Sequence, residues 1–142
     1  MKTMNDLITA KGRDIFFVTP SQTVHDVVKV MSDRGVGALL VMEGDKLSGV
    51  VSERDVARKV ILQQRIAEEV PVREIMTERV VCARPSLTVH EAMAIMTDKR
   101  IRHLPVVDGD TVKGVVSIGD LVKEIIEEQQ FLIEQLEHYI SG

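Results

Sequence analysis

Aromatic and cysteine residues are scarce in this 142-residue chain, and each shortage argues against a class of function. One Tyr, three Phe and no Trp leave few rings to stack on bases, and a net charge of -4 with intermixed signs forms no basic stripe. Both observations argue against a nucleic-acid binder. The single cysteine, Cys82, cannot form a disulfide within one chain, and its apolar surroundings predict a small buried strand residue rather than a reactive thiol.

Long apolar runs and catalytic motifs are also missing. No apolar stretch approaches the roughly 18 residues that span a bilayer, and the N-terminus lacks a basic segment followed by an apolar core. We therefore expect a cytoplasmic protein without a membrane partner. The chain has no Ser-His-Asp or Cys-His order, no glycine-rich phosphate loop and no metal-ligand cluster, and His25 and His90 stand apart from other ligands. No catalytic residue and no metal site are predicted.

What the chain does contain is an internal repeat. Residues 20–61 align with residues 85–126 at a constant offset of 65 without a gap, and 17 of the 42 pairs are identical. Two copies are too few for an open solenoid, and 142 residues that are 44% apolar amount to one domain's worth of protein. The two repeats should therefore complete each other, and the space between them is where a site is first expected.

Each repeat is predicted to fold as strand, helix, strand, strand, helix, so the predicted fold class is α+β. β-branched runs predict a first strand, Ser or Thr ahead of an acid predicts a helix start, and apolar runs around a Gly-Asp turn predict a hairpin. The predicted strands are 15–18, 38–42 and 47–51 in repeat 1 and 80–83, 103–107 and 112–116 in repeat 2. The first helices carry predicted buried stripes at Val24, Val27, Val28 and Met31 and at Val89, Ala92, Met93 and Met96.

The junction between the last strand and the last helix of each repeat carries the clearest chemical signal. Ser52 and Ser117 are predicted N-caps, and Asp55 and Asp120 follow three residues later. A helix N-terminus presents unpaired amides and partial positive charge that suit a phosphate, and a carboxylate can accept two hydrogen bonds from a ribose diol. The alternative is a plain capping box, in which the acid bonds back to the cap residue.

Repeat 2 also carries a basic pair that repeat 1 lacks. Arg102 and His103 stand where a buried strand is predicted to begin, whereas repeat 1 has Gly37 and Ala38 at these positions. Cations in such a place need an anion nearby, either a carboxylate or a bound phosphate. An alternative stays open, in which Arg102 pairs with an acid of the C-terminal helix.

These motifs, taken in order, resemble a tandem pair of cystathionine beta-synthase (CBS) domains. The resemblance rests on Pro-Ser-x-Thr-Val ahead of a helix, Arg-His-Leu-Pro-Val-Val-Asp opening a hairpin, and Gly-Val-Val-Ser-x-x-Asp leading into the last helix. It extends over nearly the whole chain, from about residue 5 to residue 126. The chain is most similar to short stand-alone CBS-pair proteins, which carry no enzyme domain although they are often labelled as related to inosine monophosphate dehydrogenase.

The resemblance implies two repeats packed with pseudo-twofold symmetry into one module, with clefts that bind an adenosyl ligand such as AMP, ADP, ATP, NAD(H) or S-adenosylmethionine. It implies no catalytic cofactor. By position, the resemblance implies that the ribose is bound by Asp55 and Asp120, and that ribose or phosphate is bound by Ser52 and Ser117. It implies that the phosphate is bound by Arg102, His103 and Arg54. The adenine edge would be contacted by Thr19, Thr23, Ala83 and Arg84, and Pro105 is the remaining residue of the predicted site. Because the basic pair is missing from repeat 1, the two clefts should differ in affinity.

The tail of the chain predicts one long amphipathic helix that runs past the end of repeat 2. Its predicted apolar face consists of Leu121, Ile125, Leu132, Leu136 and Tyr139. We expect this face to bury against a second copy, which would make the protein a homodimer; the alternative is that it folds back on its own module. The expected organisation is repeat 1 at 5–66, repeat 2 at 70–127 and a helical extension at 128–142.

The sequence thus predicts a non-catalytic regulatory module that senses energy or redox state. It would bind an adenine nucleotide and convert occupancy into a change of dimer geometry or of affinity for an unidentified protein target. The alternative function, from another class, is an interaction scaffold whose C-terminal helix binds a partner and whose nucleotide clefts are vestigial.

Overall fold

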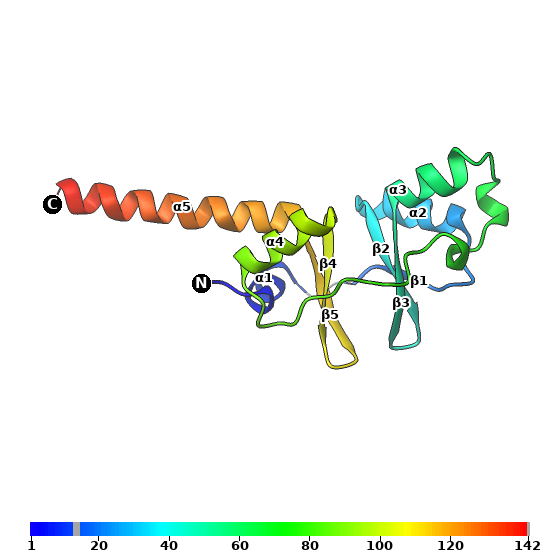
Figure 1. Cartoon of the computed structure of the whole chain (residues 1–142), viewed down its shortest axis with the longest axis horizontal. Coiled ribbons are helices and arrows are strands. Elements are labelled where there is room, and N and C mark those ends of the chain that lie inside the picture. Colours follow the sequence, from blue (N-terminus) through cyan, green and yellow to red (C-terminus); the bar gives the residue numbers. More distant parts are fainter. Residues whose placement is uncertain (13–14, 142) are drawn as a thin grey trace. The chain divides into compact units, whose positions relative to one another are not determined.

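The computed structural model describes residues 1–12 and 15–141 and divides into two compact units (Figure 1). The repeat 1 unit is built mainly from residues 15–81. The repeat 2 unit is built mainly from the N-terminal helix α1 (Met4–Lys11), residues 82–108 and the chain from residue 113 onward. The N-terminal helix therefore packs with the repeat that lies farther along the sequence.

Both units show the predicted mixture of helices and short sheets, and each is described by itself. The repeat 1 unit contains β1 (Phe17–Val18), α2 (Val24–Arg34), β2 (Ala38–Glu43), β3 (Lys46–Ser52), α3 (Glu53–Val56), a π-helical turn (Ala57–Ile61) and two 3-10 turns (Ala67–Glu69 and Val72–Glu74). The repeat 2 unit contains α1, α4 (Val89–Lys99), β4 (His103–Asp108), β5 (Thr111–Ser117) and the 24-residue helix α5 (Ile118–Ser141). The predicted fold class and the long C-terminal helix are confirmed.

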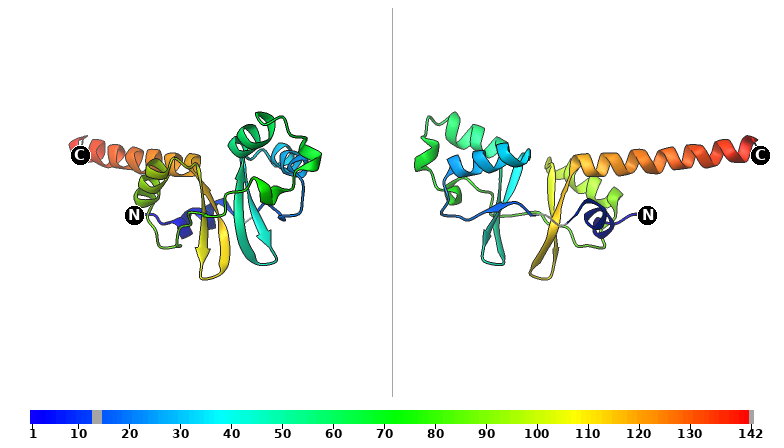
Figure 2. Two further views of the ribbon diagram at one scale, coloured as in Figure 1. Left: turned by 45° about the vertical axis from the view of Figure 1, so that its right-hand side comes forward. Right: turned by 180° about the vertical axis from the view of Figure 1, so that it is seen from behind.

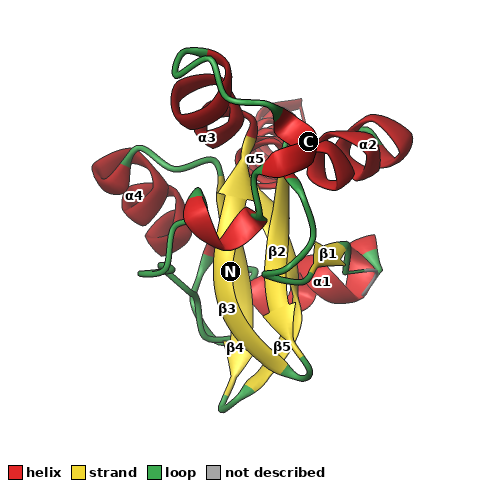
Figure 3. Ribbon diagram, turned by 90° about the vertical axis from the view of Figure 1, so that its right-hand side faces the viewer, coloured by secondary structure: helices red, strands yellow, loops and turns green. Residues whose placement is uncertain are grey.

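Sheet topology follows the predicted hairpins. In the repeat 1 unit, β2 pairs antiparallel with β3, and the short strand β1 lies parallel to β2 at its other edge (Figure 3). In the repeat 2 unit, β4 and β5 form a two-stranded hairpin. Leu39 and Val41 of β2 and Val51 of β3 are at most 2% exposed and belong to the repeat 1 core, so this sheet forms one wall of that core.

Reciprocal capping boxes begin the first helix of each repeat. The Thr23 hydroxyl accepts the Asp26 N–H at 3.3 Å while the Asp26 carboxylate accepts the Thr23 N–H at 3.1 Å. Thr88 and Glu91 make the same pair of bonds in α4. The sequence left open whether a Ser or a Thr caps these helices, and Thr is the residue that satisfies the free amides of the first turn.

Both predicted first strands are shorter than expected. The strand predicted over 15–18 is reduced to β1, and the strand predicted over 80–83 is reduced to one parallel bridge between Ala83 and Val106. In that bridge the Ala83 N–H donates to the Pro105 carbonyl at 2.8 Å. The chain turns directly afterwards at Pro20 or Pro85, so only one or two residues can pair with the neighbouring strand.

Two predictions of burial were wrong. Cys82 is exposed, because Ala83 makes the bridge and takes the buried position instead. Partial burial still raises the pKa of the Cys82 thiol, which disfavours the reactive thiolate. On α2, Val28 is 44% exposed, because only the stripe formed by Val24, Val27 and Met31 faces the core.

The N-terminal segment completes the repeat 2 unit through its backbone. The Met4 N–H donates to the Leu87 carbonyl at 2.8 Å, and the Val89 N–H donates to the Lys2 carbonyl at 3.0 Å. Met4 is fully buried, and Leu7 and Ile8 of α1 are buried beside it. Residues that precede β1 in sequence are thus part of the core of the repeat 2 unit.

Residues 70–77, the linker that follows repeat 1, complete the repeat 1 unit through backbone hydrogen bonds in the same way. The Val72 N–H donates to the Gln22 carbonyl at 2.8 Å, and the Val24 N–H donates to the Val70 carbonyl at 2.9 Å. Val72 and Ile75 are buried in the core of that unit. Since Gln22 and Val24 occupy the positions of Leu87 and Val89 at the repeat offset, the two segments are structural equivalents.

Two glycines sit where these segments cross the return strands. A Cβ on Gly49 of β3 would lie 2.8 Å from the backbone oxygen of Thr77 and 2.9 Å from the Met76 sulfur. At the equivalent position in β5, a Cβ on Gly114 would lie 3.2 Å from side-chain atoms of Ile8. The first contact involves backbone that is itself paired to Val50, whereas the second involves a side chain that can move.

We expect Gly49→Ala to lower the free energy of unfolding by about 1–3 kcal/mol, because the added methyl group overpacks against fixed backbone. Gly114→Ala is the matched control and should cost less, since Ile8 can change rotamer. Urea denaturation followed by circular dichroism measures both. An equal loss in the two variants would contradict this account of the crossing.

Candidate functional site

The residues expected to bind a nucleotide fall into two groups, one in each unit. The repeat 1 group is Thr19, Thr23, Ser52, Arg54 and Asp55, and the repeat 2 group is Ala83, Arg84, Arg102, His103, Pro105, Ser117 and Asp120. In both groups, backbone hydrogen bonds bring residues from distant parts of the sequence together.

The backbone of the repeat 2 group converges on the start of α5. The Ile118 N–H donates to the Arg102 carbonyl at 2.8 Å, which joins the first turn of α5 to the residue ahead of β4. Ala83 bonds to Pro105 on the same strand, and both backbone groups of Ala83 are used in that bridge. The equivalent bond in the repeat 1 group runs from the Glu53 N–H to the Gly37 carbonyl at 3.0 Å.

Asp120 takes part in the capping arrangement at the start of α5. Its carboxylate accepts the Ser117 N–H at 2.8 Å, and its own N–H donates to the Ser117 hydroxyl at 3.2 Å. The ammonium of Lys11, at the end of α1, also lies 2.7 Å from Oδ2 of Asp120 and donates to the Val115 carbonyl at 3.3 Å. The two bonds that the carboxylate accepts, from the Ser117 N–H and from Lys11, both reach Oδ2, and among the described residues no hydrogen bond to Oδ1 of Asp120 is found.

The electrostatic balance at Asp120 favours the charged form. Partial burial alone would raise the pKa of its carboxyl group. The hydrogen bond from Lys11, the hydrogen bond from the Ser117 N–H, the charge of Lys11 and the Ser117 hydroxyl together outweigh burial, so the pKa of Asp120 lies below its ordinary value of 3.8. The carboxylate is therefore ionised at neutral pH and able to accept further hydrogen bonds.

Asp55, the equivalent acid in repeat 1, is more completely occupied. Its Oδ2 accepts the Ser52 N–H at 2.9 Å and the Ser52 hydroxyl at 3.1 Å, and its Oδ1 lies 3.1 Å from the Lys59 ammonium. Lys59 is held in turn by the Ile75 carbonyl at 2.8 Å. The side chain of Asp55 is 13% exposed, against 27% for Asp120, so Asp120 is the more accessible of the two acids.

The sequence allowed the alternative that each acid bonds back to the serine that caps its helix. The structure confirms this capping box at Asp55, and Asp120 makes the corresponding bonds with Ser117. A capping role does not exclude a second role in binding, because one carboxylate offers about four acceptor sites. The unused acceptor on Asp120 is the point at which the two acids differ.

The basic residues are more exposed than the sequence suggested. Arg102 was predicted at the start of a buried strand, but β4 begins one residue later at His103, and the Arg102 side chain is exposed. In the described part of the chain no carboxylate lies within 4.0 Å of its guanidinium group, so the ion pair with an acid of the C-terminal helix does not form. Arg54 is likewise exposed at the start of α3.

The charge around the equivalent position in repeat 1 has the opposite sign. A Cβ on Gly37 would lie 3.5 Å from the carboxylate carbon of Glu53. Where repeat 2 has the cation of Arg102, repeat 1 therefore has an acid close to a glycine. An anionic ligand would be attracted at the first position and repelled at the second.

The remaining predicted residues make local bonds. The Thr19 N–H donates to the Gln22 side chain at 2.9 Å, immediately after β1, and Thr23 caps α2. Arg84 is exposed and donates from Nε to the Ser86 hydroxyl at 3.1 Å.

Sequence reasoning missed the two lysines that hold the acids. Lys59 follows Asp55 by four residues on the same helical segment, a spacing that predicts contact and could have been noticed. Lys11 is 109 residues from Asp120, and no local pattern connects them. Only the packing of α1 in the repeat 2 unit brings this lysine to the acid.

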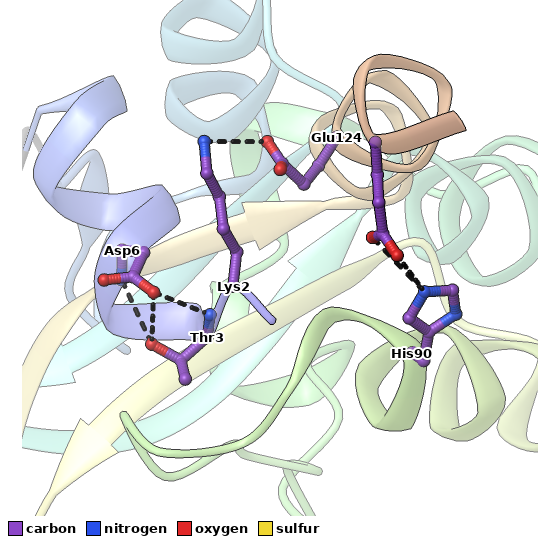
Figure 4. Close-up of polar contacts among 6 residues, drawn as sticks. Lys2, Thr3, Asp6, His90 and Glu124 are labelled. Atoms are coloured by element: carbon purple, nitrogen blue, oxygen red, sulfur yellow. Dashed lines mark hydrogen bonds and ion pairs between the residues drawn. The ribbon is translucent and has the colours of Figure 1, made fainter. Parts of the chain in front are cut away.

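A second ion pair anchors the N-terminal segment near α5 (Figure 4). The Lys2 ammonium lies 3.4 Å from Glu124, an acid of α5 that is only 8% exposed, while Thr3 and Asp6 form the capping box of α1. His90 is exposed, and its Nε2 lies 3.4 Å from Glu128. Among the described residues, no group of three His, Cys, Asp or Glu side chains is placed to hold a metal ion.

Two βαββα repeats, each starting its last helix with a Ser-x-x-Asp cap, define the class of tandem CBS repeats. The family model for the CBS domain matches residues 5–62 and again residues 72–127, so the chain belongs to the CBS domain family and carries two copies of the domain in tandem. CBS-pair proteins are regulatory. None of the helices in the described ranges has the length and apolar character required to cross a membrane.

Relatives of known sequence and structure agree with this assignment. The chain is 38% identical over 149 residues to the mitochondrial CBS domain-containing protein CBSX3 of Arabidopsis thaliana, an alignment covering 99% of this chain and 72% of that protein. A CBS-domain protein from Burkholderia ambifaria has a TM-score of 0.86 at 47% identity, covering 90% and 96% of the two chains. The CBS domain protein PAE2072 from Pyrobaculum aerophilum, solved in complex with AMP, has a TM-score of 0.75 at 24% identity, covering 83% and 88%, a likeness of fold alone.

We expect Lys11→Met to raise the pKa of Asp120, because the variant loses the ammonium that stabilises the carboxylate. A pKa lowered by folding stabilises the protein above the ordinary value of 3.8, and this contribution is lost as the pH falls through the lowered folded value. The stability difference between wild type and variant, about 0.5–1 kcal/mol for a partly exposed pair, should therefore shrink in acid.

Carbon-detected NMR titration of the Asp120 carboxyl group and urea denaturation between pH 2 and pH 7 measure these two effects. Lys29→Met removes an exposed lysine that has no ion pair in the described chain and serves as the control. An Asp120 pKa unchanged by Lys11→Met would contradict the assigned contact.

Proposed function

We propose that this chain is a non-catalytic regulatory module that binds an adenine nucleotide at the start of α5 and signals occupancy to a partner. The observation that carries the proposal is the pairing of an ionised Asp120, whose Oδ1 has no partner in the described chain, with an exposed Arg102 that lacks an ion pair there. The backbone bond from Ile118 to Arg102 keeps both near the same helix N-terminus. The AMP bound to the Pyrobaculum protein supports the choice of ligand class at the level of the fold.

The chemistry of the site fits a phosphorylated riboside. The unused oxygen of Asp120 is an acceptor for a ribose hydroxyl, and a charged acceptor strengthens such a bond. The first turn of α5 supplies amides for a phosphate, and Gly119 leaves this turn open, since a Cβ there would meet only the Ser117 hydroxyl, at 3.6 Å. Arg102 adds positive charge on the β4 side of the same turn, and His103 follows it at the start of β4.

The repeat 1 group should bind the same ligand more weakly. Both oxygens of Asp55 already have partners, and the Glu53 carboxylate lies beside Gly37. Arg54 is the phosphate candidate that remains there. A ligand at this site would have to displace Lys59 or share its acid, which costs binding free energy.

Occupancy can be signalled through Lys11, because this residue and the ribose would share one carboxylate. A ligand that weakens or strengthens the contact between Lys11 and Asp120 changes how firmly α1 is held to the first turn of α5. We further propose that the protein is a cytoplasmic homodimer and that a target protein binds it differently with and without nucleotide. The module would thereby sense the energy or redox state of the cell.

Isothermal calorimetry with AMP, ADP, ATP, NAD, NADH and S-adenosylmethionine tests the proposal. We expect one phosphorylated member to bind with one strong site per chain, and Asp120→Asn to weaken it by more than about fivefold, since a charged hydrogen bond contributes about 1 kcal/mol or more. Asp110→Asn, in the exposed turn between β4 and β5, is the matched control and should bind normally. No binding across the panel, or wild-type affinity in Asp120→Asn, would contradict the proposal.

Arg102→Gln separates phosphate recognition from recognition of the nucleoside. The variant should lower affinity for AMP about tenfold, the scale of one charge-assisted contact, while adenosine should bind the variant and the wild type equally. Arg100→Gln changes another exposed arginine two residues away and controls for net charge. Equal losses for AMP and adenosine would mean that Arg102 supports the site without contacting phosphate.

One observation favours the alternative function, an interaction scaffold with vestigial nucleotide sites. The C-terminal half of α5 carries exposed large apolar residues, with Leu136 60% and Tyr139 84% exposed. If none of the nucleotides tested binds, this helix would be the main functional feature of the chain.

A further inference from the structure

Helix α5 continues well past α4 in the repeat 2 unit (Figure 2). Only its first turns are buried against the unit, where Leu121 is fully buried and Glu124 is 8% exposed. From residue 129 to residue 141 most side chains are exposed. An exposed amphipathic helix of this length is typical of a surface that another chain covers.

The exposed apolar residues follow a heptad pattern. Val122, Ile126, Ile133, Leu136 and Ile140 are 42%, 60%, 48%, 60% and 82% exposed, and the exposed Gln129 fills the remaining position of the series. Alternating steps of four and three residues place all six on one face, about 27 Å long at 1.5 Å per residue. Phe131 is also exposed but lies on the opposite side of α5.

We propose that α5 pairs with α5 of a second copy in antiparallel orientation, with its centre near residue 131. The pairing rests on the homodimer of the proposed function and specifies which surface forms it and in which direction. A twofold axis makes the face self-complementary, because each residue on one side of the centre meets its counterpart from the other side.

The apolar layers match in this register. Val122 lies opposite the partner's Ile140, and Ile126 lies opposite the partner's Leu136. The one polar member, Gln129, lies opposite the partner's Ile133, close to the centre. Each aliphatic side chain at either end of the face is thus buried against another aliphatic side chain.

Charge complementarity selects the antiparallel direction. Lys123 and Glu137 flank the heptad face on the same edge, both are exposed, and neither makes an ion pair within the described chain. In the antiparallel register Lys123 lies beside the partner's Glu137, and the twofold axis forms this pair twice. In a parallel pair the two residues lie at opposite ends and cannot meet, because 14 residues of helix extend about 21 Å.

Beyond Lys123, the chain has no lysine or arginine that could replace it in an ion pair with Glu137. Lys123 is the last lysine or arginine in the chain, and the residues after it include five glutamates. An acidic helix has few ways to pair with itself without charge repulsion. The opposite edge of the face is apolar, and there Ile125 lies beside the partner's Tyr139 and Leu132 beside the partner's Leu132.

A charge exchange tests the direction of pairing. Lys123→Glu and Glu137→Lys should each raise the dimer dissociation constant about three- to tenfold in sedimentation equilibrium at low salt, since each replaces two attractions with two repulsions. The double variant Lys123→Glu with Glu137→Lys should return to the wild-type constant. Full-length folding is checked by circular dichroism. Additive losses in the double variant would overturn the antiparallel pairing, as would a dimer unaffected by either single change.

Cross-linking gives a second readout that does not depend on charge. In a Cys82→Ser background, Gln130→Cys should form a disulfide-linked dimer, because residue 130 meets its own counterpart near the centre of an antiparallel pair. Leu136→Cys would cross-link only in a parallel pair. Cross-linking of Leu136→Cys alone, or a protein that is monomeric at all concentrations, would overturn the proposal.

Nucleotide binding is measured on the same charge variants to keep the two proposals apart. AMP affinity should be unchanged in Glu137→Lys, which lies far along α5 from Asp120. Loss of the dimer with normal AMP binding would support the pairing. A dimer that follows the charge exchange while no nucleotide binds would sustain the pairing and reject the nucleotide site.

Discussion

The structure depends on backbone hydrogen bonds that join each repeat to a segment lying outside it. Residues 2–5 bond to the turn before α4, and residues 70–73 bond to the turn before α2. These bonds insert Met4 and Val72 into the two cores as fully buried residues. A repeat without its segment would expose that apolar surface and leave backbone groups unpaired, so neither repeat is a complete folding unit in sequence order.

The same segments contribute to the difference between the two sites. The N-terminal segment carries Lys11 to Asp120, and the linker supplies the Ile75 carbonyl that holds Lys59 against Asp55. Both acids keep the same bonds to the preceding serine, yet one retains an unused oxygen and the other does not. Asymmetry between repeats that are 17 of 42 identical therefore arises both from what packs around them, as with Lys11, and from substitutions within them, as with Lys59.

Local features of the fold were predictable because they depend on neighbours in sequence. The hairpins follow from Gly-Asp turns between apolar runs, and the capping boxes at Thr23 and Ser52 follow from an acid three residues later. The first strands were overestimated, since the strand predicted over 80–83 is reduced to the bridge between Ala83 and Val106. Cys82 was misplaced for the same reason, because burial depends on which residue makes that single bridge.

The sequence by itself determined the two repeats, the CBS family, the Ser-x-x-Asp helix starts and the amphipathic C-terminal helix. The helix starts and the amphipathic helix follow from the spacing of neighbouring residues, and the repeats follow from a constant offset of 65 along the chain. Only the tertiary structure decided that α1 belongs to the second repeat, that Lys11 reaches Asp120 across 109 residues, and that Arg102 is exposed without an ion pair in the described chain. The physical reason is that side-chain contacts between distant segments depend on how cores pack, and periodicity contains no information about that packing.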